Sequence, residues 1–200
     1  MTAHQIASFL IFAVVAAGTP GPSNVMLTAA GANGGIRKGL PSLFGVTLGM
    51  GVMMLLVSFG LGSLVLHSPI VLKILNWGGA VFLLWLAWRI ATASAASSAP
   101  EGKPVGFFGA MGFQWINPKS WLVCTSAAGT YLQTTAGSAF TQSALIGVLF
   151  FLAALPCCFL WLALGASAQR FLHSGRRLRI FNIAMGALLA ASVALMLLHL

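Results

Sequence analysis

Two polar, proline-containing stretches interrupt apolar parts of this 200-residue chain: Thr19-Pro20-Gly21-Pro22-Ser23-Asn24 and Asn117-Pro118-Lys119. Proline removes a backbone donor and displaces the carbonyl group four residues earlier, so each stretch should break a helix. We expect the breaks to free the carbonyl groups of Ala16, Gly18 and Gln114. Such carbonyl groups could coordinate an ammonium group.

A new half-helix should begin after each break. Thr19-Pro20 and Asn117-Pro118 both fit an N-cap residue followed by proline at the first helical position. A helix N-terminus presents unpaired N–H groups and a partial positive charge, which suit a carboxylate. The two breaks together therefore predict a site for a zwitterion.

Lys119 would be the second residue of the second half-helix, roughly 20 Å into the bilayer from a start near Val105 at 1.5 Å per residue. Insertion scales place the cost of a charged lysine at the bilayer centre at about 2.5–3.5 kcal/mol. The apolar segments contain no Asp or Glu that could pair with it. We therefore predict that Lys119 binds the carboxylate of a ligand. The alternative is that the prolines only kink the helices and the lysine snorkels to an interface.

The predicted substrate-binding residues come from both breaks. They are Pro20, Gly21, Pro22, Ser23, Asn24, Gln114, Asn117, Pro118 and Lys119.

The composition places these breaks in a membrane protein. Hydrophobic residues make up 59% of the chain and charged residues 6%, a balance outside the range of soluble domains. A net charge of +9 would suggest nucleic-acid binding in a soluble protein. Here the basic residues lie mostly between apolar runs, so they indicate membrane orientation and no nucleic-acid partner is expected.

We predict an all-α integral membrane protein with six transmembrane helices in the lipid bilayer. The expected spans are 4–33, 40–66, 69–92, 105–132, 141–168 and 179–199. Residues 1–93 would form a first three-helix repeat, 94–104 a cytoplasmic linker and 105–200 a second repeat. With three spans per half, the repeats must be inverted, and the first helix of each would be broken. Paired broken spans are typical of the binding site of secondary transporters.

The basic residues predict the orientation. The connections after the first, third and fifth spans contain eight Lys or Arg residues, whereas the opposite side contains only Lys73. Basic loops stay in the cytoplasm, so both termini are expected outside it. Residues 5–17 resemble the core of a signal peptide, but no basic residue precedes them. We interpret them as part of a retained first span.

Catalytic and metal chemistry have no support in the sequence. Paired carboxylates, a Ser/His/Asp set and metal-type cysteine spacing are all missing, so we expect neither an enzyme nor a metal or cofactor. The three cysteines, Cys124, Cys157 and Cys158, are interpreted as core residues. The pattern Gly45-Val-Thr-Leu-Gly49 favours close helix packing, and a homodimer stays an open alternative.

At this point the motifs resemble a known family. The stretch from Thr19 to Asn24 and the Arg37-Lys38-Gly39-Leu40-Pro41 motif are similar to the opening signature of the LysE/RhtB family of amino-acid exporters. The run from Gly106 to Trp121, with Asn117-Pro118-Lys119 inside it, is similar to that family's second signature. Within the family, the chain resembles most the branch that exports cysteine and O-acetylserine-like amino acids.

The resemblance implies export of a small amino acid across the bacterial inner membrane, coupled to proton entry. We therefore predict a secondary transporter for small neutral amino acids that works by alternating access around the two breaks. A passive channel or a non-transporting subunit of a membrane assembly is the alternative, in which both breaks serve packing alone.

Overall fold

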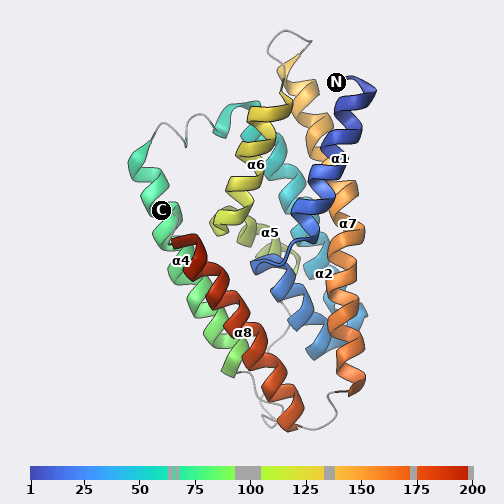
Figure 1. The fold of residues 1–200 in the computed structure, drawn as a ribbon, viewed down its shortest axis with the longest axis vertical. Coiled ribbons are helices and arrows are strands. Elements are labelled where there is room, and N and C mark those ends of the chain that lie inside the picture. The colour runs from blue at the N-terminus through green and yellow to red at the C-terminus, as the bar shows by residue number, and fades with distance from the viewer. Residues whose placement is uncertain (63–64, 66–67, 93–104, 133–137, 172–174, 198–200) are drawn as a thin grey trace.

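The computed structural model describes the chain except for residues 63–64, 66–67, 93–104, 133–137, 172–174 and 198–200, and every element in its described part is a helix (Figure 1). The elements are α1 (Ala3–Gly18), α2 (Pro22–Leu56), the π-helix η1 (Val57–Leu61), α4 (Pro69–Thr92), α5 (Phe107–Ile116), α6 (Pro118–Tyr131), α7 (Ala139–Phe171) and α8 (Gly175–Leu197). The all-α prediction is confirmed for this part of the chain. The predicted linker, 94–104, lies outside the described residues.

The first predicted break separates α1 from α2. The prediction that Thr19 is the N-cap of the new half-helix is wrong, because Thr19 closes α1. Its N–H group and its hydroxyl both donate to the carbonyl oxygen of Val15, at 2.9 and 2.6 Å. Helix α2 begins at the second proline of the break, Pro22, and Gly21 is its N-cap.

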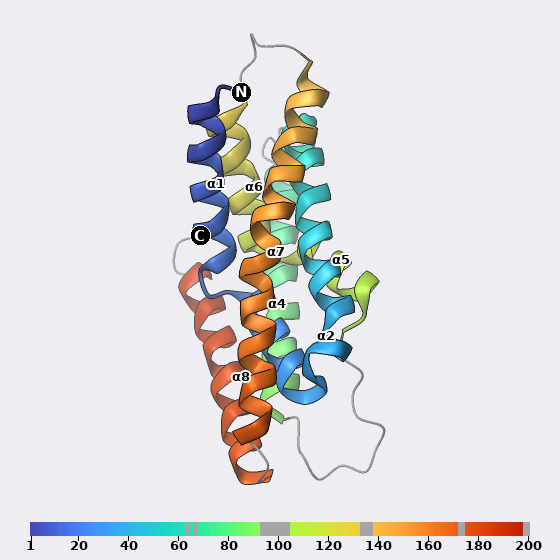
Figure 2. The same ribbon diagram turned by 90° about the vertical axis from the view of Figure 1, so that its right-hand side faces the viewer.

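Helix α2 contains more than the second half of the first predicted span. The sequence predicts a loop between residues 33 and 40, but in this segment only Gly35 departs from helical geometry, and the chain reverses direction there (Figure 2). Gly35 has φ 71° and ψ 178°. Glycine adopts this left-handed region without steric cost, so a single residue makes the turn.

The second predicted break separates α5 from α6 at Asn117. Asn117 is the N-cap of α6: its backbone is extended and its side chain accepts a hydrogen bond from the backbone N–H of Lys119 at 3.1 Å. The cap predicted at Asn117 is confirmed, as is the position of Lys119 as the second residue of the half-helix that begins at Pro118.

Helices α2 and α7 form the centre of the molecule and pack closely along their length. Helix α1 packs on α7, and α5 packs on α2, while α4 and α8 form a separate pair beside them (Figures 1 and 2). Gly45 and Gly49 of α2 face α5, where a side chain on Gly45 would overlap the carbonyl group of Phe107. The close packing predicted for this glycine pair is therefore used within the chain.

The buried side chains form two clusters that meet at the level of the breaks. Val46 and Cys158 belong to one cluster, and Met50 and Phe150 to the other. Each of these pairs joins α2 to α7.

By length and composition, two described segments could cross a membrane, Pro22–Leu61 and Ala139–Ala168. Helices α1, α5 and α6, which flank the breaks, are shorter, because proline divides the first and fourth predicted spans. The turn of α2, the end of α4 and the start of α8 lie at the same end of the molecule, the lower end in Figure 1. These segments carry Arg37, Lys38, Arg89, Arg176, Arg177 and Arg179.

Candidate functional site

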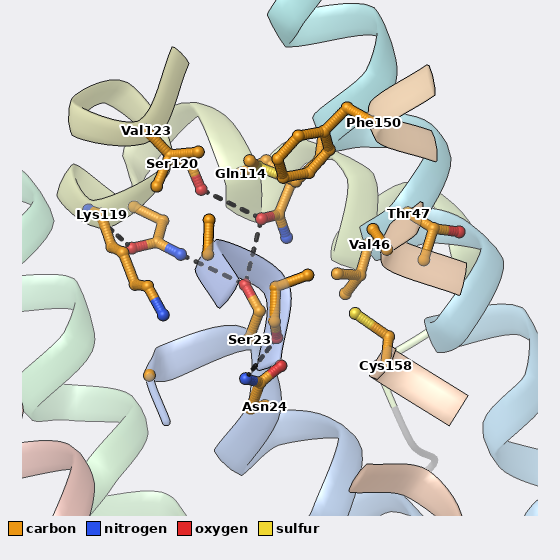
Figure 3. Close-up of a pocket in the computed structure, with 16 residues that line it drawn as sticks. Ser23, Asn24, Val46, Thr47, Gln114, Lys119, Ser120, Val123, Phe150 and Cys158 are labelled. Carbon is orange, nitrogen blue, oxygen red and sulfur yellow. Dashed lines mark hydrogen bonds between the residues drawn. The ribbon is translucent and has the colours of Figure 1, made fainter. Parts of the chain in front are cut away.

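A small cavity lies where the two breaks meet (Figure 3). Six of the nine predicted site residues line it: Gly21, Ser23, Asn24, Gln114, Asn117 and Lys119. The remaining lining residues are Ala16, Ala17, Val46, Thr47, Met50, Ser120, Val123, Phe150, Ala154 and Cys158.

The three prolines among the predicted site residues do not line the cavity. Pro20 is exposed, and Pro22 is buried at the start of α2. Pro118 packs close to Gly79 of α4, where a Cβ atom would meet its ring at 3.4 Å. The prolines therefore shape the backbone around the cavity without facing it.

Gln114 joins three segments around the cavity. Its side chain is fully buried, and its Oε1 atom accepts hydrogen bonds from the hydroxyl groups of Ser23 at 3.0 Å and Ser120 at 3.1 Å. The Oγ atom of Ser23 in turn accepts from Nδ2 of Asn117 at 3.2 Å. Four polar side chains thus hold one another in place (Figure 3). They are Ser23 of α2, Gln114 of α5, Asn117 at the second break and Ser120 of α6.

Lys119 reaches from the second break to the first. Its Nζ atom donates to the carbonyl oxygen of Thr19 at 2.7 Å, and its stem crosses Gly21. A Cβ atom on Gly21 would lie 2.9 Å from Cδ of Lys119 and 3.0 Å from Nζ. Glycine at this position therefore makes room for the lysine.

The two half-helix N-termini differ in their capping. At α6, the side chain of Asn117 already occupies the backbone N–H of Lys119. At α2, Gly21 has no side chain, and among the described residues no side-chain hydrogen bond caps the helix. The N-terminus that stays open toward the cavity is therefore that of α2, at Ser23 and Asn24.

Three carbonyl groups at the end of α1, those of Ala17, Gly18 and Thr19, already have partners. The indole Nε1 of Trp161 donates to Gly18 at 3.3 Å, and Nδ2 of Asn24 donates to Ala17 at 2.9 Å and to Thr19 at 2.8 Å. At the second break, the carbonyl oxygen of Gln114 accepts from the N–H of Asn117 at 3.3 Å. The prediction that proline leaves Gly18 and Gln114 free is therefore wrong, because nearby donors replace the missing one.

Apart from Thr47 and Ser120, the rest of the cavity wall is apolar, and no sequence motif predicts it. Val46 and Met50 of α2 and Phe150 and Cys158 of α7 line this part of the site. Cys158 is buried in a core cluster, as predicted, and also lines the cavity. These residues lie in continuous apolar helices, where no local signal separates a cavity wall from ordinary core.

The site offers one cation, an open helix N-terminus, backbone carbonyl oxygens and a small apolar wall. Among the described residues, no group of three or more His, Cys, Asp or Glu side chains could hold a metal ion. Glu101 is the only acidic residue of the chain. The arrangement suits a small molecule with one anionic and one cationic group.

Comparisons with known proteins identify a family and several relatives of this chain. The family described as LysE type translocator matches residues 13–200. The chain is 36% identical over 187 residues to a cysteine/O-acetylserine efflux protein of Salmonella choleraesuis (strain SC-B67), covering 90% of this chain and 92% of the relative. It is 34% identical over 192 residues to the protein of that name in Klebsiella pneumoniae (94% and 95% covered) and 32% over 187 residues to that of Escherichia coli K12 (90% and 92%). No solved structure matches.

Proposed function

The chain belongs to the LysE type translocator family, a family of membrane transporters rather than enzymes, and we propose that it exports small neutral amino acids from the bacterial cytoplasm. Cysteine and O-acetylserine are the first candidates. The support is the name shared by relatives that match over nearly the whole chain.

The observation that carries the proposal is the cavity at the junction of the two breaks. A half-helix C-terminus, a half-helix N-terminus and a lysine converge there from segments about a hundred residues apart in sequence. A ligand with ammonium and carboxylate groups on neighbouring carbon atoms matches these three features in charge.

Each part of the substrate has a place in this proposal. The carboxylate binds at the open N-terminus of α2 with Lys119, and the ammonium group binds the carbonyl oxygens at the end of α1. The substrate's side chain lies against Val46, Met50, Phe150 and Cys158. Among the described residues no carboxylate faces this wall to bind a second cation, so we expect lysine and arginine to be poor substrates.

Alternating access is proposed through an inverted repeat of two three-helix halves. The packing pattern supports it: the first half-helix of each half, α1 or α5, packs on the long helix of the other half, α7 or α2. The third helices, α4 and α8, pack on each other. We propose coupling to proton entry on the family resemblance alone.

The proposed location is the bacterial inner membrane, with both termini outside the cytoplasm. The support is the gathering of basic segments at one end of the molecule. This end would face the cytoplasm under the positive-inside rule.

Efflux from proteoliposomes tests the proposed function. The purified full-length protein is reconstituted with radiolabelled cysteine, O-acetylserine, serine or lysine inside the vesicles, and release is followed over time. We expect saturable release of the three neutral amino acids. Unsaturable release would indicate a channel, no release of any substrate a non-transporting subunit, and saturable release of lysine would overturn the proposed selectivity.

Lys119→Ala tests the site within this assay. Because the variant removes the cation that faces the cavity, we expect a loss of affinity of about tenfold or more, the usual worth of a charge-assisted hydrogen bond. Lys73→Ala is the matched control, since Lys73 is exposed on α4 and does not line the cavity. Equal transport by both variants and the wild type would contradict a role for Lys119 in binding.

A further inference from the structure

The contact between Lys119 and Thr19 joins the two breaks directly. Lys119 stands at the start of α6, and Thr19 caps the end of α1, with 2.7 Å between Nζ and the carbonyl oxygen. Figure 3 shows the side chain of Lys119 extending away from the polar network of Gln114, which Lys119 joins through its backbone N–H group. The cation that sequence analysis assigned to a carboxylate is thus held by a backbone carbonyl group.

The end of α1 is a place where a cation is stabilised. A helix C-terminus carries a partial negative charge, and its last carbonyl groups point away from the helix. The carbonyl oxygen of Thr19 also accepts from Nδ2 of Asn24 at 2.8 Å, so the side chain of a buried residue holds this carbonyl group in position. The occupant of this place is an ammonium group, the same chemical group that an amino acid carries.

We propose that Lys119 is a tethered occupant of the ammonium subsite, and that a zwitterionic amino acid displaces it by an exchange of partners. The carboxylate of the substrate takes the ammonium group of Lys119, and the ammonium group of the substrate takes the carbonyl oxygen of Thr19. The inference rests on the proposed function and assigns to the same site the chemical class that it accepts.

The exchange is balanced in charge. Before it, one ammonium group donates to one carbonyl group; after it, two ammonium groups each have a partner, and the added carboxylate compensates the added cation. No proton needs to leave Lys119. A buried cation without a partner is costly, so Lys119 should leave Thr19 only when an anion is there to receive it.

The hydrogen bond between Lys119 and Thr19 would also act as a latch, because it connects the end of α1 to the start of α6. When the substrate replaces this bond, the two breaks can move relative to each other. A ligand opens the latch only if it has both a carboxylate and an ammonium group with N–H donors. Simple amines, simple carboxylates and betaines, whose quaternary nitrogen has no N–H, should leave it closed.

Binding of an alkylammonium ion tests the inference independently of transport. Isothermal titration of the purified full-length protein in nanodiscs uses ethylammonium, serine and glycine betaine as probes. The wild type should bind serine but neither of the other two. Lys119→Ala vacates the subsite, so its affinity for ethylammonium should exceed that of the wild type by about tenfold or more.

A second variant and a control keep the test sharp. Lys119→Met retains most of the stem beside Gly21 and serves as a second variant in case the alanine variant does not fold. It should gain the same affinity for ethylammonium. Lys73→Ala should behave as the wild type. Thermal unfolding of each protein confirms that the binding data come from folded molecules.

Three results would overturn the inference. These are equal ethylammonium binding by wild type and Lys119 variants, absence of ethylammonium binding by folded variants, and release of about one proton per serine bound by the wild type. The last would indicate deprotonation of Lys119 instead of partner exchange. A different result would separate this inference from the proposed function. If no amino acid is bound or transported while the variants still gain ethylammonium binding, the proposed substrate class is wrong, but the ammonium subsite at Thr19 is supported.

Discussion

At the scale of single residues, Gln114 is the side chain on which the polar part of the site depends. It is fully buried, its Oε1 atom accepts two serine hydroxyl groups, and its Nε2 atom donates to the carbonyl oxygen of Ala110 at 3.0 Å. Both polar atoms of its amide are thus held by hydrogen bonds to α2, α5 and α6. Its role is to position Ser23 and Ser120, which both line the cavity.

Gln114→Leu should destabilise the protein because it leaves the buried hydroxyl group of Ser120 and the half-buried hydroxyl group of Ser23 without their acceptor. An unsatisfied buried polar group costs about 1–3 kcal/mol, so we expect the free energy of unfolding to fall by roughly 2 kcal/mol or more. Ser120→Ala removes one donor and leaves the bond between Ser23 and Gln114 intact, and should cost about 1 kcal/mol. Chemical unfolding in detergent measures both; equal effects would contradict the hub role of Gln114.

Gly21 in the first break and Gly35 at the turn within α2 are required for different physical reasons. Gly21 gives space, since its missing side chain is where the stem of Lys119 lies. Gly35 gives a backbone conformation, φ 71°, that reverses the chain within α2. Only the second reason can be anticipated from local sequence, because the first depends on a residue almost a hundred positions away.

At the scale of elements, close contact between α2 and α7 sets the separation of the two core clusters. Gly31 and Gly165 stand at this crossing. A side chain on Gly165 would overlap the carbonyl group of Thr28, and one on Gly31 would overlap that of Leu162. Small residues of this kind allow membrane helices to approach until their backbones touch.

Gly165→Ala should therefore be strongly destabilising, because backbone atoms of α2 must move to accept the methyl group. Overpacking typically costs about 1–3 kcal/mol. Gly129→Ala in α6 is the matched control: a side chain there meets nothing within 4 Å, and alanine in a helix is more stable than glycine by about 0.5–1 kcal/mol. Melting temperatures in detergent should separate the two variants, and a melting temperature of Gly165→Ala as high as that of Gly129→Ala would rule out the tight crossing.

At the scale of the whole molecule, charge is distributed unevenly along the long axis. The turn of α2, the last turn of α4 and the start of α8 bring their basic residues to one end, while the N-terminus lies toward the other (Figure 1). The unevenness follows from the chain path, since these connections are separated in sequence. A membrane potential and anionic lipids would favour one orientation of such a molecule.

Cysteine labelling in cells tests this orientation. Ala3→Cys lies at the exposed start of α1, and Ile36→Cys lies in the exposed part of the turn in α2. A membrane-impermeant thiol reagent should label Ala3→Cys in cells with a permeabilised outer membrane, and Ile36→Cys only after the inner membrane is opened. The reverse pattern would place the N-terminus and the basic end on the opposite sides from those proposed.

The sequence by itself determined the helical class, the position of both breaks, the cap at Asn117 and the place of Lys119 on α6. These are local matters: proline ends a helix whatever surrounds it, and an asparagine before proline can cap the next helix with its own side chain. The membership of a transporter family also follows from these motifs and their matches along the chain.

Only the tertiary structure decided what these local features contact. It placed the ammonium group of Lys119 on Thr19, gave the carbonyl group of Gly18 to Trp161 and left the N-terminus of α2 open while that of α6 was capped. It also brought Phe150 and Cys158 to the cavity wall. Each of these outcomes depends on the packing of segments far apart in the sequence, and the energy of such contacts is not encoded in the pattern of either segment alone.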